Sequence, residues 1–182
     1  MLDAAIAEFA ESGYSDTSMD AIAARAQISK PMLYLYYGSK DELFSACITR
    51  ESGRFIDVMS AGFDPTLRQR EQARILVREF LRYVYENAQS WRVIYRVASG
   101  SAGFSDVVTT ARAEITAMIT ALIRQGTTVE GASDTDFELT AVALVGAAEA
   151  VADRVSEGDV SIDAATDLLV GITWRGLKGV GT

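Results

Sequence analysis

Apolar side chains recur every three or four residues along almost the whole chain, which is the spacing of amphipathic helices. The first such stripe, which predicts a helix over residues 1–12, comprises Leu2, Ala5, Ile6, Phe9 and Ala10. Gly13 breaks this helix, and either Thr17 or Ser18 can cap the next one. The inward positions of that second helix are Met19, Ile22, Ala23 and Ala26. Two amphipathic helices are therefore predicted to open the chain.

A very short third helix is predicted after a tight turn at Gln27, a position where glycine is often found. Pro31 suits the first turn of a helix and disfavours helical geometry at the residue before it, so the helix begins near Ser29 or Lys30. Gly38 ends it about two turns later.

A helix this short cannot turn all of its large side chains inward. The side chains in question are Met32, Tyr34, Leu35 and Tyr36. Several of them must point outward, and such a rigid helix with polar and aromatic tips is typical of one that enters a DNA groove. With the second helix and the turn, it predicts a helix-turn-helix.

A long fourth helix over residues 40–60 follows a capping box formed by Ser39 and Glu42. Its apolar positions are Leu43, Phe44, Cys47, Ile48, Phe55, Ile56 and Met59. Asp64 and Pro65 then have the cap and first-turn pattern of a new helix. This helix is expected to connect an N-terminal helix-turn-helix module, residues 1–47, to a helical remainder, residues 48–182.

The remainder repeats the helical pattern five more times, with breaks at residues 99–103, 127–133 and Gly158. The sixth helix is expected over residues 90–98, and the eighth, over 134–156, is rich in small residues. No run alternates in the manner of a strand, and no internal repeat is present. The predicted fold class is all-α with about nine helices.

Composition narrows the function classes. The chain has no histidine, one cysteine and no glycine-rich phosphate loop, so an enzyme, a cofactor and a metal site are not expected. Cys47 lies on the apolar side of its helix and is expected to be a small buried hydrophobe. No stretch has the pattern of a signal peptide or a membrane span, and the lone cysteine is compatible with a reducing cytosol, so the expected location is cytoplasmic.

The net charge of −8 argues against non-specific adhesion to nucleic acid, and the first fifty residues are acidic as well. DNA binding must therefore depend on where Lys30 and Lys40 lie.

The N-terminal pattern resembles the DNA-binding domain of the TetR family of bacterial transcriptional regulators. The resemblance covers Leu2 to Cys47 without gaps and rests on G-Y-S-D-T-S-M-D-A-I-A-A-R-A followed by I-S-K-P-M-L-Y-L-Y-Y-G-S-K-D-E-L. It implies that the short helix enters the major groove of double-stranded DNA. Beyond residue 60 the resemblance is only one of helical layout.

The resemblance implies a role for each matched position. Bases are faced by Lys30, Pro31, Met32 and Tyr34, and Ser29 at the start of the helix is also expected to contact DNA. The DNA backbone is held by Tyr36 and Lys40, and phosphate is touched by Thr17 and Ser18. Alternatives remain for several of these. Lys40 can be a solvated first-turn residue. Met32 can belong to the core, and Tyr34 and Tyr36 can be partly buried scaffold. Tyr37 is expected to belong to the core.

The C-terminal helices are expected to bind a small effector and to form a homodimer. An apolar pocket can be lined by Phe80, Tyr83, Trp91, Tyr95, Phe104 and Met118, although each can be ordinary core. The candidates for the dimer interface are Phe137, Leu144, Val145, Ala148, Leu168, Ile172 and Trp174. Four arginines recur at i, i+4 beside glutamates, which indicates a solvated, ion-paired face, with a partner surface as the alternative: Arg70, Arg74, Arg78 and Arg82.

Together these features predict a ligand-responsive regulator, most often a repressor in such a family. As a dimer it would bind a palindromic operator, because one short helix reads too few base pairs. A small, largely apolar effector would release it, with the helix over residues 40–60 as the connecting rod. The alternative is an all-α small-molecule-binding or interaction protein that no longer binds DNA.

Overall fold

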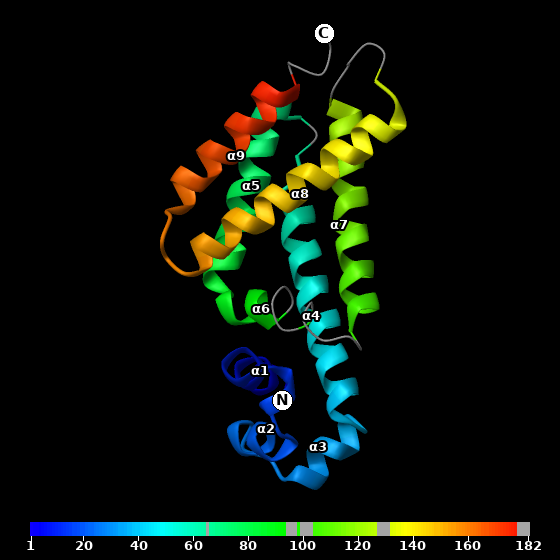
Figure 1. Cartoon of the computed structure of the whole chain (residues 1–182), viewed down its shortest axis with the longest axis vertical. Helices are drawn as coiled ribbons and strands as arrows, with labels where there is room; N and C mark the ends of the chain where they lie inside the picture. The colour runs from blue at the N-terminus through cyan, green and yellow to red at the C-terminus, as the bar shows by residue number, and fades with distance from the viewer. Residues whose placement is uncertain (65, 94–97, 99–103, 127–131, 178–182) are drawn as a thin grey trace. The chain divides into compact units, whose positions relative to one another are not determined.

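The structure, a computed structural model, describes residues 1–64, 66–93, 98, 104–126 and 132–177. These residues form nine helices and no strand, which confirms the all-α fold class. The helices are α1 (Leu2–Asp16), α2 (Met19–Arg25), α3 (Lys30–Tyr36), α4 (Lys40–Ala61), α5 (Gln69–Glu86), α6 (Ala88–Arg92), α7 (Ser105–Gly126), α8 (Asp134–Ser156) and α9 (Ile162–Leu177) (Figure 1). None of these helices is long and apolar enough to cross a membrane.

The chain divides into two compact units. The first comprises residues 1–54 and 87–111, and the second comprises residues 55–86 and 112–182. Both α4 and α7 contribute residues to each unit. The division by packing therefore differs from the expected domains 1–47 and 48–182, whose boundary stays a prediction.

The first unit is built around one apolar cluster to which α1, α2, α3 and α4 all contribute. Phe44 of α4 is fully buried, and its ring meets those of Phe9, Tyr14 and Phe104 with centroids 4.7–5.0 Å apart. Cys47 belongs to the same cluster, and burial raises the pKa of its thiol to about 12. The thiol is the buried hydrophobe that the sequence predicts.

The turn between α2 and α3 is closed by an unusual backbone conformation. Gln27 has a φ of 55°, in the left-handed region that glycine adopts most easily. The prediction that Gln27 takes the place of a turn glycine is confirmed. Leu33 of α3 then packs into the cluster without any exposed surface, which fixes α3 on the first unit.

The caps of the helices settle two open points. Ser18, not Thr17, caps α2, because its Oγ accepts a hydrogen bond from the Ala21 N–H at 3.1 Å. At the start of α4, Ser39 Oγ accepts from the Glu42 N–H at 3.1 Å, and the Glu42 carboxylate accepts from the Gly38 N–H at 3.0 Å. The second bond thus reaches one residue further back than in the expected capping box.

In the second unit, α5 packs against both α8 and α9, as Figure 1 shows. Arg74 and Arg78 of α5 pair with Asp167 and Asp163 of α9 at 2.6 and 3.2 Å. Arg82 pairs within α5. These three residues confirm the expected ion-paired face, and they show that part of it connects two helices.

One predicted helix is described only in part. Periodicity predicts a helix over residues 90–98; α6 is Ala88–Arg92, and Val93 and Ala98 are in π-helical conformation. Residues 94–97 lie outside the part of the chain that the structure describes. The same holds for the expected break at residues 99–103 and for Pro65.

Candidate nucleic-acid interface

Helix α3 exposes four large side chains in only seven residues. Leu35 is 82% exposed and Tyr36 60%, while Met32 and Tyr34 are a little less than half exposed. The sequence prediction that several of these side chains point outward is confirmed. Large apolar side chains that cluster in contact with water often mark an interaction site. This face of α3 is therefore the strongest candidate for a binding surface in the first unit.

Lys30 stands at the first turn of α3 beside this exposed face. Its ammonium pairs with the Asp20 carboxylate of α2 at 2.7 Å, and this pair raises the pKa of Lys30. Both side chains are about half exposed or more, so solvent screens the pair and a stronger partner can displace it. Lys30 is therefore charged at neutral pH and within reach of an incoming anion or base.

The beginning of α3 is fixed by its own cap. Ser29 Oγ accepts a hydrogen bond from the Met32 N–H at 3.3 Å, and Pro31 follows in the first turn. Ser29 and Pro31 are both exposed. The two residues therefore set the start of the helix and also lie on its surface.

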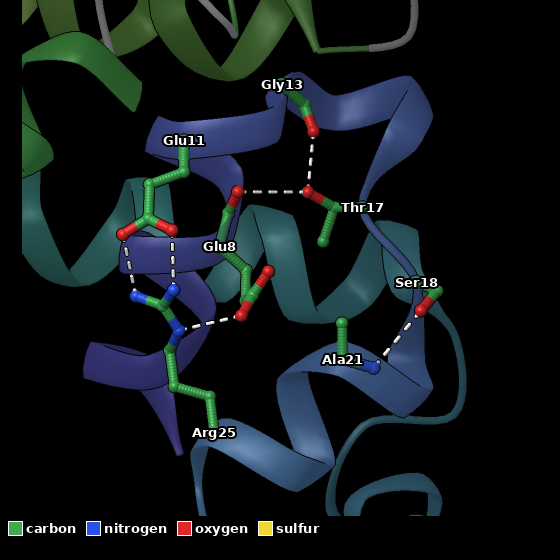
Figure 2. Close-up of polar contacts among 7 residues, drawn as sticks. All are labelled: Glu8, Glu11, Gly13, Thr17, Ser18, Ala21 and Arg25. Atoms are coloured by element: carbon green, nitrogen blue, oxygen red, sulfur yellow. Dashed lines mark hydrogen bonds and ion pairs between the residues drawn. The ribbon is translucent and has the colours of Figure 1, made fainter.

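Thr17 and Ser18 differ sharply, although they are neighbours. Thr17 is only 4% exposed, and its hydroxyl lies 2.7 Å from the Gly13 carbonyl oxygen and 3.1 Å from that of Glu8 (Figure 2). Ser18 is exposed at the start of α2. Of the two residues expected at phosphate, only Ser18 presents a side chain to solvent.

Two of the elements around this surface are tied by an arginine. Figure 2 shows Arg25 of α2 reaching two carboxylates of α1, with Nε 2.7 Å from Glu8 and Nη2 2.5 Å from Glu11. The contacts to Arg25 lower the pKa of Glu11. A guanidinium that bonds two carboxylates restricts the angle between α2 and α1. This restriction helps to fix the helices on which α3 packs.

Lys40 is engaged within the protein. Its ammonium donates to three backbone carbonyls, two in the last turn of α1 and one at Thr17 just after it, at 2.8 to 3.3 Å, and lies 4.4 Å from the centre of the Tyr14 ring. The backbone contact that the resemblance implies for Lys40 therefore stays a prediction, while its contacts inside the first unit are observed.

Leu35 is a surface residue to which the sequence reasoning gave no role. It follows the fully buried Leu33 by two positions, which is about 200° around a helix. Once Leu33 is known to face the core, Leu35 must point almost directly away. The signal was present in the sequence, but it depends on knowing the orientation of α3.

The pocket candidates divide between the two units. Trp91 and Phe104 lie in the first unit and are buried, and Phe104 belongs to its core cluster. Phe80 and Tyr83 are buried in the second unit, where each ring packs 5.6 Å from that of Phe55. Met118 is partly buried. Tyr95 lies outside the described residues, and the pocket stays a prediction.

The dimer candidates are also placed unevenly. Leu168 and Ile172 of α9 are each 51% exposed, whereas Val145 of α8 is buried in its own protomer. The partly buried candidates are Phe137, Leu144 and Ala148. The side chain of Trp174 is outside the described part. Two exposed aliphatic residues on α8 were not foreseen: Leu139 and Val142.

The geometry of the first unit defines a class of protein. A supported pair of short helices, a tight turn and an exposed second helix with hydroxyl, lysine and apolar tips make a DNA-binding helix-turn-helix. The rest of the described chain is helical, as in a regulator with a separate sensing domain.

Comparison with known families agrees with this class. Residues 1–47 match the model described as bacterial regulatory proteins, tetR family. Residues 69–176 match the model described as tetracyclin repressor-like, C-terminal domain. The chain therefore belongs to the TetR family of transcriptional regulators, and the resemblance predicted from its N-terminal residues is confirmed.

Individual relatives show how far the likeness extends. A TetR-like transcriptional regulator from Rhodococcus sp. RHA1 is 49% identical, with a TM-score of 0.85 over 98% of this chain and 93% of that one. The HTH-type transcriptional activator FasR of Mycolicibacterium smegmatis is 33% identical over 52% of this chain, a match that spans only 43% of its own length. FadR of Bacillus subtilis, solved in complex with stearoyl-CoA, shares the fold at 15% identity, with a TM-score of 0.81 over 94% of this chain and 95% of that one.

Proposed function

We propose that two copies of this chain bind a pseudo-palindromic operator through α3 and repress transcription. The exposed face of α3 is the observation that carries this proposal. In it, apolar tips at Met32 and Leu35 flank the hydroxyls of Tyr34 and Tyr36, a mixture that suits thymine methyl groups and phosphate oxygens. Lys30 can donate to guanine O6 and N7 once it leaves Asp20.

The contact set is narrower than the resemblance alone implies. The residues that present side chains on this surface are Ser18, Ser29, Lys30, Pro31, Met32, Tyr34, Leu35 and Tyr36. Thr17 is left out because its hydroxyl is buried and bonded to its own chain. Lys40 is left out because its ammonium bonds three backbone carbonyls of the first unit. The small number of cations, together with a net charge of −8, leads us to expect weak non-specific binding and a shallow dependence of affinity on salt.

A homodimer fits the exposed side chains of the second unit. Leu139 and Val142 on α8 and Leu168 and Ile172 on α9 are all more than half exposed. Four aliphatic side chains of this size, on helices that pack against each other, suit an isologous contact with a second copy. Such a dimer would present two α3 helices to neighbouring turns of the major groove.

A small, largely apolar effector bound by the C-terminal helices would release the operator. The buried aromatic residues of the second unit, Phe55, Phe80 and Tyr83, are the described groups that can meet an apolar ligand. Release requires a difference in affinity of only about 1–3 kcal/mol between the two states of the dimer. Because one neighbour in fold carries stearoyl-CoA, long-chain acyl-CoA compounds are sensible first effectors to test.

Selection from a random DNA library, followed by anisotropy on the enriched sequence, tests the proposal. We expect a palindromic consensus with half-sites a whole number of helical turns apart. Tyr36→Phe should weaken binding at matched salt, whereas Tyr85→Phe, at an exposed tyrosine of α5, should bind as the parent does. Absence of enrichment would favour the alternative, an all-α binding protein that no longer recognises DNA.

A further inference from the structure

The first residue of α4 reaches back across the first unit. Lys40 Nζ donates hydrogen bonds to the carbonyl oxygens of Tyr14 at 2.8 Å, Thr17 at 3.0 Å and Ser15 at 3.3 Å. An ammonium has three N–H donors, so all of them are engaged. Its charge also lies 4.4 Å from the centre of the Tyr14 ring, a favourable cation–π distance.

A second contact joins the same two segments. The Tyr14 hydroxyl donates to the carboxylate of Asp41, the residue after Lys40. Burial raises the pKa of Tyr14 to about 12, so the phenol keeps its proton at neutral pH and remains a donor. The Lys40 and Asp41 contacts thus meet on one tyrosine at the end of α1.

These contacts join the segments before and after the helix-turn-helix. The helix-turn-helix runs from Met19 to Tyr36. Lys40 follows its last residue by four positions, and the carbonyls that it bonds lie two to five positions before its first residue, Thr17 being next to Ser18, the cap of α2. The ammonium therefore connects the chain that enters the helix-turn-helix with the chain that leaves it.

The position of Lys40 in the first turn of α4 is electrostatically unfavourable unless nearby groups offset its charge. A lysine in the first turn of a helix is opposed by the positive end of the helix dipole. Three carbonyl oxygens from the end of α1 and the following turn supply the negative partial charge that offsets this. A lysine satisfied in this way has no N–H left for a phosphate oxygen.

We propose that Lys40 is a positioning residue for DNA binding, which closes the helix-turn-helix at both ends and so holds Ser18 and α3 in place without touching a phosphate. This role rests on the proposed binding of DNA. It differs from a phosphate contact in one measurable respect. A lysine that bonds carbonyls displaces no counterions from DNA, so its loss leaves the salt dependence of binding unchanged.

Operator binding at several salt concentrations distinguishes the possible roles. Lys40→Met keeps the aliphatic stem and removes the ammonium, and Lys30→Met is the matched control at a lysine of α3. At a temperature where circular dichroism shows every variant folded, we expect Lys40→Met to bind about tenfold more weakly with the slope of the parent. If Lys30 contacts a phosphate, Lys30→Met should make the negative slope of log K against log salt shallower by about one. If Lys30 contacts a base, the variant should instead change the base preference.

Two results would overturn the positioning role. If the slope for Lys40→Met is shallower than the parent's by about one, Lys40 contacts a phosphate. An affinity equal to the parent's, with only a lower melting temperature, would make it a structural residue and nothing more. Lys40→Gln, which keeps a neutral donor, should lie between the parent and Lys40→Met and serves if the methionine variant does not fold.

Amide hydrogen exchange tests the same role without DNA. The N–H groups of Ala21 and Ile22 bond to Ser18, at the point that Lys40 is expected to hold. In Lys40→Met they should exchange about tenfold faster, while amides in the middle of α8 keep the rate of the parent. Unchanged exchange at Ala21 and Ile22 refutes the positioning role whatever the DNA results, whereas a parent that binds no DNA refutes only the proposed function.

Discussion

Each unit of the molecule exposes large apolar side chains, but the two surfaces differ in chemistry. On α3 of the first unit, Leu35 and Met32 alternate with the hydroxyl-bearing Tyr34 and Tyr36. On α8 and α9 of the second unit, the exposed large apolar side chains among those described are aliphatic: Leu139, Val142, Leu168 and Ile172. A mixed surface suits a partner that offers methyl groups and anionic oxygens together, as DNA does. A purely aliphatic surface suits a protein partner with the same character.

The supports of the two surfaces differ as well. Helix α3 rests through the fully buried Leu33 on a core of interlocking rings, and part-buried hydrogen bonds from Lys40 to the carbonyl oxygens of Tyr14 and Thr17 join the segments on either side of the helix-turn-helix. Helix α9 is joined to α5 by exposed ion pairs at Arg74 and Arg78. Exposed pairs contribute little and weaken with salt. The geometry of the proposed DNA-binding surface is thus more firmly set than that of the proposed dimer surface.

The largest effect is expected in the core beneath α3. Phe44→Ala removes a fully buried ring that meets three others. We expect the free energy of unfolding to fall by about 3–5 kcal/mol, with loss of DNA binding at temperatures where the parent still binds. Urea titration followed by circular dichroism measures the change. Phe63→Ala, at an exposed phenylalanine of the second unit, is the control and should cost under about 1 kcal/mol.

The next effect concerns the aliphatic surface of the second unit. Leu168→Lys and Ile172→Lys place charges on the exposed side chains of α9, and together they should convert a dimer into a monomer with its helical content intact. Each change is expected to weaken association by about 2 kcal/mol. Sedimentation equilibrium gives the mass in solution. Tyr85→Lys, at an exposed tyrosine of α5, should leave the mass unchanged, and a double variant that stays dimeric would place the interface elsewhere.

A smaller effect is expected from Leu35 on α3. Because this side chain is 82% exposed, Leu35→Ala should leave the melting temperature within about 1 °C of the parent value. If Leu35 meets a thymine methyl, operator affinity should fall by about 1 kcal/mol, and discrimination should relax at one base pair of each half-site. A binding measurement against operators substituted at single positions tests this. Equal affinity for all operators would remove Leu35 from the interface.

The first unit was more predictable from sequence than the second because its constraints are local. The cap at Thr17 or Ser18, the proline of α3 and the tight turn at Gln27 each follow from a few neighbouring residues, and the structure assigns the cap to Ser18. The outward direction of α3 followed from its shortness. In contrast, the contacts of Lys40 join residues 23 to 26 positions apart, and no periodic pattern indicates them.

Surface and interior were harder to assign in the second unit. Val145 was expected at an interface but is buried within the protomer, and Leu139 and Val142 are exposed instead. Helix α8 carries apolar residues on more than one side, so its sequence does not show which side meets α5 and α9. Only tertiary packing decides which side of α8 is buried. In a helix with a single apolar stripe, the spacing of the apolar residues alone identifies the buried side.

The smallest effect is expected from a carboxylate inside the second unit. Glu149 of α8 pairs with Arg112 of α7 through Oε2, while its Oε1 is buried and has no hydrogen-bond partner. Burial raises the pKa of Glu149 against the opposing charge of Arg112, with a further contribution from Asp153. A raised pKa in the folded state means that this group stabilises the fold most below pH 4.5, its ordinary value, and that the contribution is lost as pH rises through the folded value.

Glu149→Gln therefore replaces an ionisable, incompletely bonded carboxyl group with an amide that is neutral at every pH. We expect the variant to gain up to about 1 kcal/mol over the parent at pH 7, and the gain to shrink as pH falls toward 4.5, where the parent carboxyl also becomes neutral. Thermal unfolding at a series of pH values measures this difference. Glu138→Gln, at an exposed position of the same helix, should show no such trend. A difference between Glu149→Gln and the parent that does not change with pH would mean that Glu149 is as well solvated in the folded protein as in the unfolded chain.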